Sequence, residues 1–252
     1  MKSPVLGVLG GLGPASSAYF YDMITAHTAS ECDSDHIDLV LASAASTPDR
    51  TGFILGNGED PLPCMADCAR RLEAFGADYI AIPCNTAHYF YDEIARSVGI
   101  PVINIIRETA LYIKSLGISH IGLLATEGTV FSGAYAHVCR ETGIDCTVPE
   151  KADRDILMDI IYGQIKAGKR ADMDAFHAVS RRLTERGCER LILGCTELSL
   201  LKRDEGLDGA LYTDSLEVLA CRSIVLCGGR PIGFSDDLIK FEEERECSFR
   251  NC

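Results

Sequence analysis

Short apolar runs alternate with longer amphipathic stretches through most of the chain. The apolar runs are rich in β-branched residues and are bounded by Gly, Pro and Asp, which is typical of strands. We predict strands at residues 5–9, 37–42, 78–82, 101–104, 120–124, 145–148, 190–193 and 210–212. Strands that alternate with helices indicate an α/β protein whose parallel, doubly wound, flavodoxin-like sheets carry helices on both faces.

Apolar positions at helical spacing predict the helices between these strands. They cover residues 14–29, 61–75, 86–98, 108–116, 132–142, 155–167, 172–186 and 216–227, with a helix or loop to about residue 202. Beyond Gly228 the chain has a Gly-Gly-Arg-Pro break and a run of charged residues at 242–246. We therefore expect a loose tail at this end.

The pattern of the first half starts again near residue 120. Residues 76–86 (GADYIAIPCNT) align with residues 187–197 (GCERLILGCTE), and residues 6–9 (LGVL) resemble residues 121–124 (IGLL). An internal duplication explains both coincidences and predicts two lobes related by a pseudo-twofold axis, with the active site in the cleft between them. Residues 1–105 and 210–227 form the predicted first lobe, residues 106–209 the second, and residues 228–252 the tail.

Cys84 and Cys195 occupy the same position in the two repeats, directly after a strand. Ligands of open parallel sheets bind beyond the carboxyl ends of the strands, so both thiols are expected in the cleft. The backbone amides that follow each cysteine can bind a carboxylate, and their positive field can lower a thiol pKa. A free cysteine is most often a small core residue, which is how we interpret most of the other ten.

Two thiols on opposite walls suit the inversion of a stereocentre. A base must remove a proton from one face of a carbon while an acid returns one to the other face. The α-hydrogen of an amino acid is weakly acidic, so the carbanion needs hydrogen-bond donors and cations at its carboxylate.

Charge and composition restrict the class of protein. A net charge of −13 argues against a nucleic-acid surface. No apolar run approaches the roughly 20 residues that span a bilayer, and the N-terminal segment is too short for a signal peptide, so we expect a cytoplasmic protein without a membrane partner. Neither metal-ligand spacing nor the Gly spacing of a dinucleotide loop is present, so we expect no metal and no cofactor.

Five motifs together resemble the aspartate racemase branch of the aspartate/glutamate racemase family. They are LGGLGP at 9–14, PDRT at 48–51, PCNTAH at 83–88, ATEGT at 125–129 and GCTE at 194–197. The resemblance implies a cofactor-independent enzyme that interconverts L- and D-aspartate, with glutamate as a further substrate. It places Cys84 and Cys195 as the two groups that abstract and return the Cα proton, and it implies a homodimer.

The same resemblance implies contacts to a small acidic amino acid. Arg50 is similar to a residue that binds a carboxylate, for which its guanidinium fork is suited; the alternative is a solvated loop residue. Lys166 is similar to a second cationic contact; the alternative is a lysine favoured at a helix end. The α-carboxylate or ammonium is expected to bind Asn85, Thr86 and Thr196, and less directly Thr126 and Thr129.

Other functions stay open at this point. The chain can be another enzyme of the superfamily: a glutamate or hydantoin racemase, a maleate isomerase or a malonate decarboxylase. It can also be a non-catalytic two-lobed binding protein or sensor for an acidic metabolite, which has no need of two opposed thiols. His88, four residues after Cys84, either tunes the thiolate or supports the site from behind.

Overall fold

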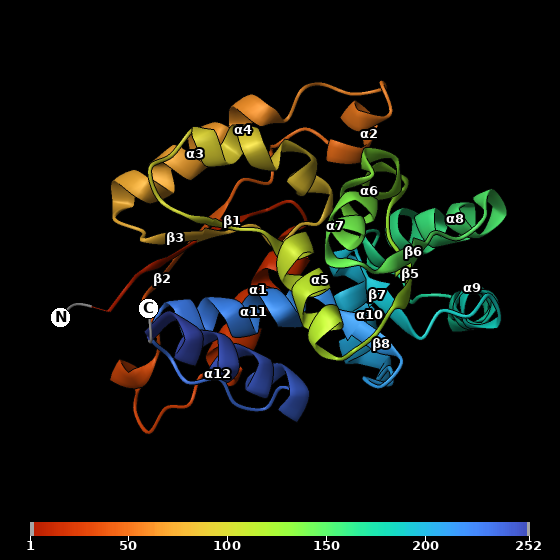
Figure 1. The fold of residues 1–252 in the computed structure, drawn as a ribbon. Helices are drawn as coiled ribbons and strands as arrows, with labels where there is room; N and C mark the ends of the chain where they lie inside the picture. The colour runs from red at the N-terminus through yellow and green to blue at the C-terminus, as the bar shows by residue number, and fades with distance from the viewer. Residues whose placement is uncertain (1–2, 251–252) are drawn as a thin grey trace.

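Two parallel sheets of four strands form the framework of the protein (Figure 1). The computed structural model describes residues 3–250, with side chains described up to residue 246. The first sheet has the order β2-β1-β3-β4 and the second β6-β5-β7-β8. The strands are β1 (Leu6–Gly10), β2 (Leu39–Ser43), β3 (Tyr79–Ala81), β4 (Val102–Ile103), β5 (His120–Leu124), β6 (Asp145–Thr147), β7 (Arg190–Leu193) and β8 (Tyr212–Asp214). Because both sheets have the same doubly wound order, the predicted two-lobed α/β fold is confirmed.

Helices connect the strands and cover the sheets. They are α1 (Pro14–Ala26), α2 (Arg50–Ile54), α3 (Leu62–Phe75), α4 (Tyr91–Arg96), α5 (Ile105–Ser115), α6 (Glu127–Ser132), α7 (Ala134–Thr142), α8 (Lys151–Met158), α9 (Met173–Glu185), α10 (Thr196–Glu205), α11 (Ser215–Leu226) and α12 (Asp236–Arg250), with 3-10 helices η1 (Asp33–Asp35) and η2 (Thr86–Phe90) and the π-helix η3 (Asp159–Ile165). The helix predicted at 86–98 is divided into η2 and α4, and the one at 155–167 is α8 continued by η3. The sequence did not predict α2 and α6, which are too short to show helical periodicity.

The two repeats share the contact that seats a helix on its sheet. A Cβ added at Gly7 of β1 would lie 3.2 Å from the Cβ of Leu72, and one at Gly122 of β5 would lie 3.3 Å from that of Leu183. Each leucine stands four residues before a glycine of positive φ at its helix end. The duplication seen in the sequence is therefore also a duplication of packing.

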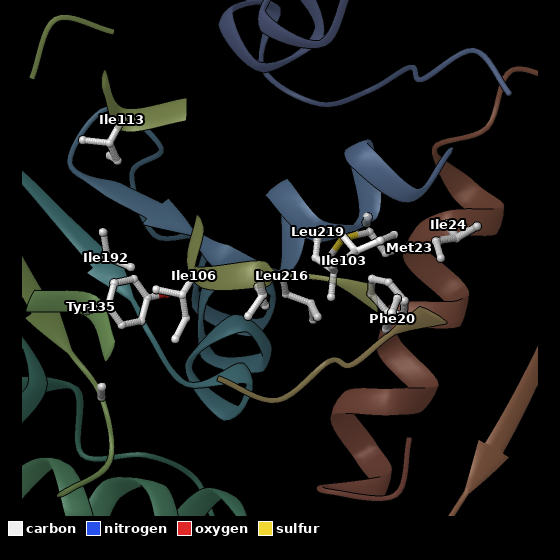
Figure 2. Close-up of a cluster of buried hydrophobic side chains, with 14 of the residues drawn as sticks. Phe20, Met23, Ile24, Ile103, Ile106, Ile113, Tyr135, Ile192, Leu216 and Leu219 are labelled. Carbon is white, nitrogen blue, oxygen red and sulfur yellow. The ribbon is translucent and has the colours of Figure 1, made fainter. Parts of the chain in front are cut away.

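A buried apolar cluster joins the two lobes into one core (Figure 2). Helix α5 follows the first sheet but packs against α7 of the second lobe, whereas α11 follows the second sheet but packs against α1 of the first. The two helices also pack against each other in the middle of the molecule (Figure 1). Figure 2 shows Ile106 of α5 and Leu216 and Leu219 of α11 in this cluster, with Phe20 of α1. Each lobe also has a buried apolar cluster of its own, around Leu9 and Ile80 in the first lobe and around Phe176 and Leu191 in the second.

The position of β8 corrects the predicted division into lobes. Residues 210–227 were assigned to the first lobe, but β8 pairs with β7, with Leu191 opposite Tyr212 in the second sheet. Within residues 210–227, only helix α11 lies against the first lobe, where it packs against α1. The chain passes from the second sheet to the first lobe at Asp214, which is both the last residue of β8 and the N-cap residue of α11. Its Oδ1 accepts the Leu216 amide at 2.8 Å. The remaining lobe boundaries stay predictions.

The expectation of a loose tail is wrong for the described residues 236–246. Helix α12 packs against α11 and α5, and Leu238 and Phe241 are buried there beside Tyr112 and Val218. Glu242, part of the charged run, is 0% exposed and accepts a hydrogen bond from Arg222 Nη1 at 2.9 Å. The charge run therefore includes an internal ion pair. Residues 251–252 of the predicted tail lie outside the described residues.

Arg222→Met is expected to lower the free energy of unfolding by about 3 kcal/mol, because it leaves the Glu242 carboxylate buried without its nearest cation. Burial already raises the pKa of Glu242, although Arg222 and Arg245 oppose this. The measurement is urea unfolding. Arg96→Met, at a side chain 73% exposed, serves as the control and should change stability by less than about 0.5 kcal/mol. Equal losses in the two variants would contradict an internal ion pair.

Candidate active site

One cavity brings together nearly all the substrate contacts and both cysteines predicted from the sequence. It is lined by Arg50, Cys84, Asn85, Thr86, Thr126, Lys166, Cys195 and Thr196, which come from both lobes, whereas Thr129 does not line it. Five lining residues were not singled out in the sequence: Leu12, Asp49, Thr51, Tyr162 and Glu197. The side chains leave about 10 Å³ of free space, which is room for about one water molecule. Admitting an amino acid therefore requires these walls to move apart.

The two cysteine turns touch each other at the carboxyl ends of β3 and β7. Cys84 follows β3 after Ile82 and Pro83, and Cys195 follows β7 after Gly194 and is the N-cap residue of α10. Thr196 Oγ1 donates a hydrogen bond to the Pro83 carbonyl at 3.3 Å, which ties one turn to the other. Both cysteines are buried. The repeat in the sequence thus corresponds to two adjacent turns in space.

Asn85 spans the two lobes with its side-chain amide. Its Oδ1 accepts a hydrogen bond from the Tyr135 hydroxyl of α7 at 2.7 Å, and its Nδ2 donates to Ser215 Oγ of α11 at 3.0 Å. Ser215 in turn donates to the Leu193 carbonyl at the end of β7. These bonds hold the Cys84 turn against the second sheet, so the structure shows a bridging role for Asn85. Contact with a substrate stays a prediction.

Three threonine hydroxyls form a second bridge between the lobes. Thr86 Oγ1 lies 3.0 Å from Thr126 Oγ1 and 2.8 Å from Thr129 Oγ1, and the last two are 3.0 Å apart. Thr126 also caps α6 by accepting the Thr129 amide. The hydroxyls satisfy one another in a buried place and fix Thr86 at the cavity wall.

Arg50 presents a buried guanidinium to the cavity. Nη1 donates to the carbonyls of Thr47 and Pro48 at 3.3 and 3.0 Å, and Nη2 donates to the carbonyl of Leu12. A guanidinium has five N–H donors, so two remain, and Nε–H has no partner among the described residues. No carboxylate within the described chain forms an ion pair with it. Its positive charge is therefore held in place and left available for an anion.

Lys166 stands at the other side of the cavity, directly after the π-helix η3. Its Nζ lies 3.0 Å from Oε1 of Glu197 and 4.9 Å from the centre of the Tyr162 ring. Tyr162 donates to Asp49 Oδ2 at 3.1 Å, which joins η3 to the loop before α2. Unlike Arg50, this cation already has a carboxylate partner. π-Helical turns recur at functional sites, so the short turn that carries Tyr162 fits its place at the cavity.

Cys195 has surroundings that keep its proton on sulfur. Its thiol donates to Oε2 of Glu197 at 3.0 Å. Burial raises the pKa of this thiol well above its usual value and the Glu197 carboxylate adds to the rise, whereas Lys166 and the Glu197 amide oppose it. The backbone amide therefore does lower the pKa of Cys195, as expected, but burial and the Glu197 carboxylate raise it by more. Glu197 was missed because an acidic residue in the first turn of a helix is ordinarily a solvated one that favours the helix dipole.

His88 supports the site from behind and does not line the cavity. Its Nδ1 lies 2.9 Å from the Cys84 carbonyl, and its Nε2 accepts the Ile105 amide at 3.2 Å. A neutral ring with its proton on Nδ1 satisfies both contacts, and burial lowers the pKa of His88, which favours that neutral form. The sequence left two interpretations of His88, tuning of the Cys84 thiolate or support of the site. The geometry agrees with the second, because His88 holds the backbone of the Cys84 turn.

No group of three or more His, Cys, Asp or Glu side chains in residues 3–246 is arranged to hold a metal ion. None of the helices described between residues 3 and 250 is long and apolar enough to cross a bilayer.

Comparison with known proteins points in one direction. A family model described as Asp/Glu/Hydantoin racemase matches residues 9–220. Among solved structures, an aspartate racemase from Picrophilus torridus has a TM-score of 0.81 and 28% identity over 95% of this chain and 99% of its own. An aspartate racemase homologue from Pyrococcus horikoshii has a TM-score of 0.72 and 25% identity over 90% and 100%.

Curated relatives match a shorter stretch. A broad specificity amino-acid racemase of Bacillus subtilis is 29% identical over 145 residues, 55% of this chain and 62% of that protein. A glutamate racemase of Persephonella marina is 30% identical over 138 residues, 54% of this chain and 52% of that protein. The chain thus spans less than two thirds of the length of these two relatives.

Proposed function

The chain belongs to the Asp/Glu/hydantoin racemase family, and on that basis we propose that it interconverts the L and D forms of aspartate, with glutamate as a slower substrate. The observation that carries this proposal is the single cavity that contains both Cys84 and Cys195 together with the uncompensated guanidinium of Arg50. A binding protein would need the guanidinium but has no use for a pair of thiols.

The proposed reaction needs one thiolate and one thiol. The thiolate removes the Cα proton of the substrate, and the other thiol returns a proton to the opposite face, so the configuration inverts. The negative charge that develops on the carboxylate is stabilised by a fixed cation and by backbone amides, which need no rearrangement during the reaction. Arg50 and the amides that follow the two cysteines are the groups we assign to this task. No cofactor is required for these steps.

The preference for a diacid is supported by the two cations of the cavity. Arg50 has two free N–H donors for one carboxylate, and the Lys166 ammonium, which has three N–H donors, can bind the other while it keeps its contact with Glu197. The similarity to the Picrophilus torridus aspartate racemase supports the four-carbon substrate. Glutamate differs by one methylene, a difference worth about 1–3 kcal/mol, so we expect slower turnover and not full exclusion.

A homodimer and a cytoplasmic location belong to the same proposal. Both rest on the resemblance of the sequence motifs to the family and on the ordinary behaviour of chains with many free thiols in a reducing compartment. Ten of the twelve cysteines lie among the residues whose side chains are described, and all ten are unpaired. Sedimentation of the purified protein measures the oligomeric state directly.

The decisive experiment is incubation of the protein with single enantiomers in deuterated water. We expect L-aspartate to lose optical activity while deuterium enters Cα, with a slower exchange of glutamate and none of alanine. Nuclear magnetic resonance reads the exchange, and chiral chromatography reads the inversion. Binding of aspartate without deuterium at Cα would replace the enzyme with a sensor, and exchange of neutral amino acids at the same rate would remove the preference for a diacid.

A further inference from the structure

Glu197 places a buried carboxylate directly against one of the two cysteines. The residue is 5% exposed, its Oε2 accepts the Cys195 thiol at 3.0 Å, and its Oε1 lies 3.0 Å from Lys166 Nζ. Room for this carboxylate exists because residue 13 is glycine: a Cβ at Gly13 would lie 2.6 Å from Oε1 of Glu197. The first lobe therefore shapes the pocket for a side chain that the second lobe provides.

The other cysteine has no such neighbour at the matching position. In the aligned repeats Glu197 corresponds to Thr86, and the Thr86 hydroxyl is engaged by the hydroxyls of Thr126 and Thr129. An anion stands two residues after Cys195, whereas a neutral hydroxyl stands two residues after Cys84. The pseudo-symmetric cavity is thus electrically asymmetric at the two atoms that would exchange protons.

We propose that Glu197 is a positioning residue that keeps Cys195 as the thiol and so makes Cys195 the proton donor, and Cys84 the base, at the start of a catalytic cycle. This rests on the two-thiol reaction proposed above. Cys84 thiolate takes the Cα proton and becomes a thiol, and the carbanion takes the proton of Cys195 Sγ, which becomes a thiolate. Exchange with water afterwards moves a proton off Cys84 and onto Cys195.

The reverse direction uses the same pair of groups. The proton of Cys195 passes by way of Oε2 of Glu197 to water, and Cys84 takes a proton from water, which leaves a Cys195 thiolate, an ionised Glu197 and a Cys84 thiol. That thiolate removes the Cα proton, and Cys84, as a thiol, supplies the proton to the opposite face. Without Glu197 as an acceptor the proton of Cys195 would have to leave a buried site unaided. Lys166, 3.0 Å from Oε1, balances the charge when thiolate and carboxylate coexist.

The charges around Cys195 determine whether removing one of them raises or lowers the pKa of this thiol. Glu197 and Lys166 are nearest, Tyr162 stands beside them on η3, and Arg50 and Asp49 line the same cavity together with Cys84. An anion in contact favours the thiol, and a cation favours the thiolate. Removal of the Glu197 charge is therefore expected to lower the pKa of Cys195, and removal of the Lys166 charge to raise it.

The test measures thiol protonation without any substrate. In a Cys84→Ser background, the rate at which iodoacetamide alkylates Cys195 is followed against pH by mass spectrometry of its peptide, because only the thiolate reacts. We expect Glu197→Gln to move the midpoint down by about one pH unit, so that alkylation below the midpoint is about tenfold faster. Lys166→Met should move it up.

Cys84 in a Cys195→Ser background provides the matched control. Its profile should move by less than half as much when Glu197→Gln is introduced. An unmoved Cys195 midpoint, or equal shifts of both thiols, would overturn the proposal. Should the glutamine variant fail to fold, Glu197→Asp withdraws the carboxylate from sulfur and should give a smaller downward shift. Since no turnover is measured, this result stands apart from the deuterium experiment, and either proposal can fail without the other.

Discussion

Replacing either Cys84 or Cys195 by serine is expected to lower racemisation of aspartate by about 10³-fold, because one positioned acid or base contributes about 10²–10⁴ to a rate. Serine keeps the size of the side chain, but its hydroxyl is a far weaker acid than a thiol. At neutral pH it therefore neither removes the Cα proton nor returns one. Both thiols take part in each turnover, so the two single variants should be equally poor, and the double variant little worse than either. Polarimetry on L- and on D-aspartate measures the loss.

Cys64→Ser is the control for this experiment, since Cys64 is an exposed free cysteine away from the cavity. It should retain full activity. Retention of a substantial rate by only one of the two active-site variants would contradict a reaction with two bases. It would favour a reaction that needs a single proton donor, such as a decarboxylation.

Replacing Arg50 by lysine is expected to reduce kcat/KM for aspartate by about 10²–10³-fold, the usual effect of removing one fixed donor from a developing anion. Lysine keeps the positive charge, but its ammonium has three N–H donors in place of five and no planar fork. The carbonyls of Leu12, Thr47 and Pro48 would compete for those donors and leave fewer for a carboxylate. The charge is thus preserved while the geometry is lost.

Steady-state kinetics on both enantiomers, together with a thermal unfolding curve, separates the two consequences of this change. Arg50 also holds the loop before α2, so some stability will be lost as well. Arg96→Lys, at an exposed side chain, should alter neither quantity. If Arg50→Lys kept more than half of kcat/KM, the guanidinium would not be the carboxylate contact and Lys166 would take its place in the mechanism.

The sequence by itself was sufficient for the features that depend on local periodicity. Strands and helices show as periods of apolar residues, and a duplicated unit shows as a repeated order of Gly, strand and Cys. Because a parallel strand ends at a defined edge of its sheet, the repeat also located Cys84 and Cys195 at the cavity. The residues predicted to contact the substrate carboxylate and ammonium line the same cavity.

Tertiary structure decided the features that depend on which distant residues meet. Glu197 looks like an ordinary first-turn acid, and only the approach of Gly13 and Lys166 makes it a buried partner of Cys195. The charged run near the C-terminus looks solvated, yet Arg222 of α11 provides a partner that lets Glu242 enter the interior. A sequence reports the polarity of each side chain, whereas the free energy of a buried charge depends on its neighbours in space.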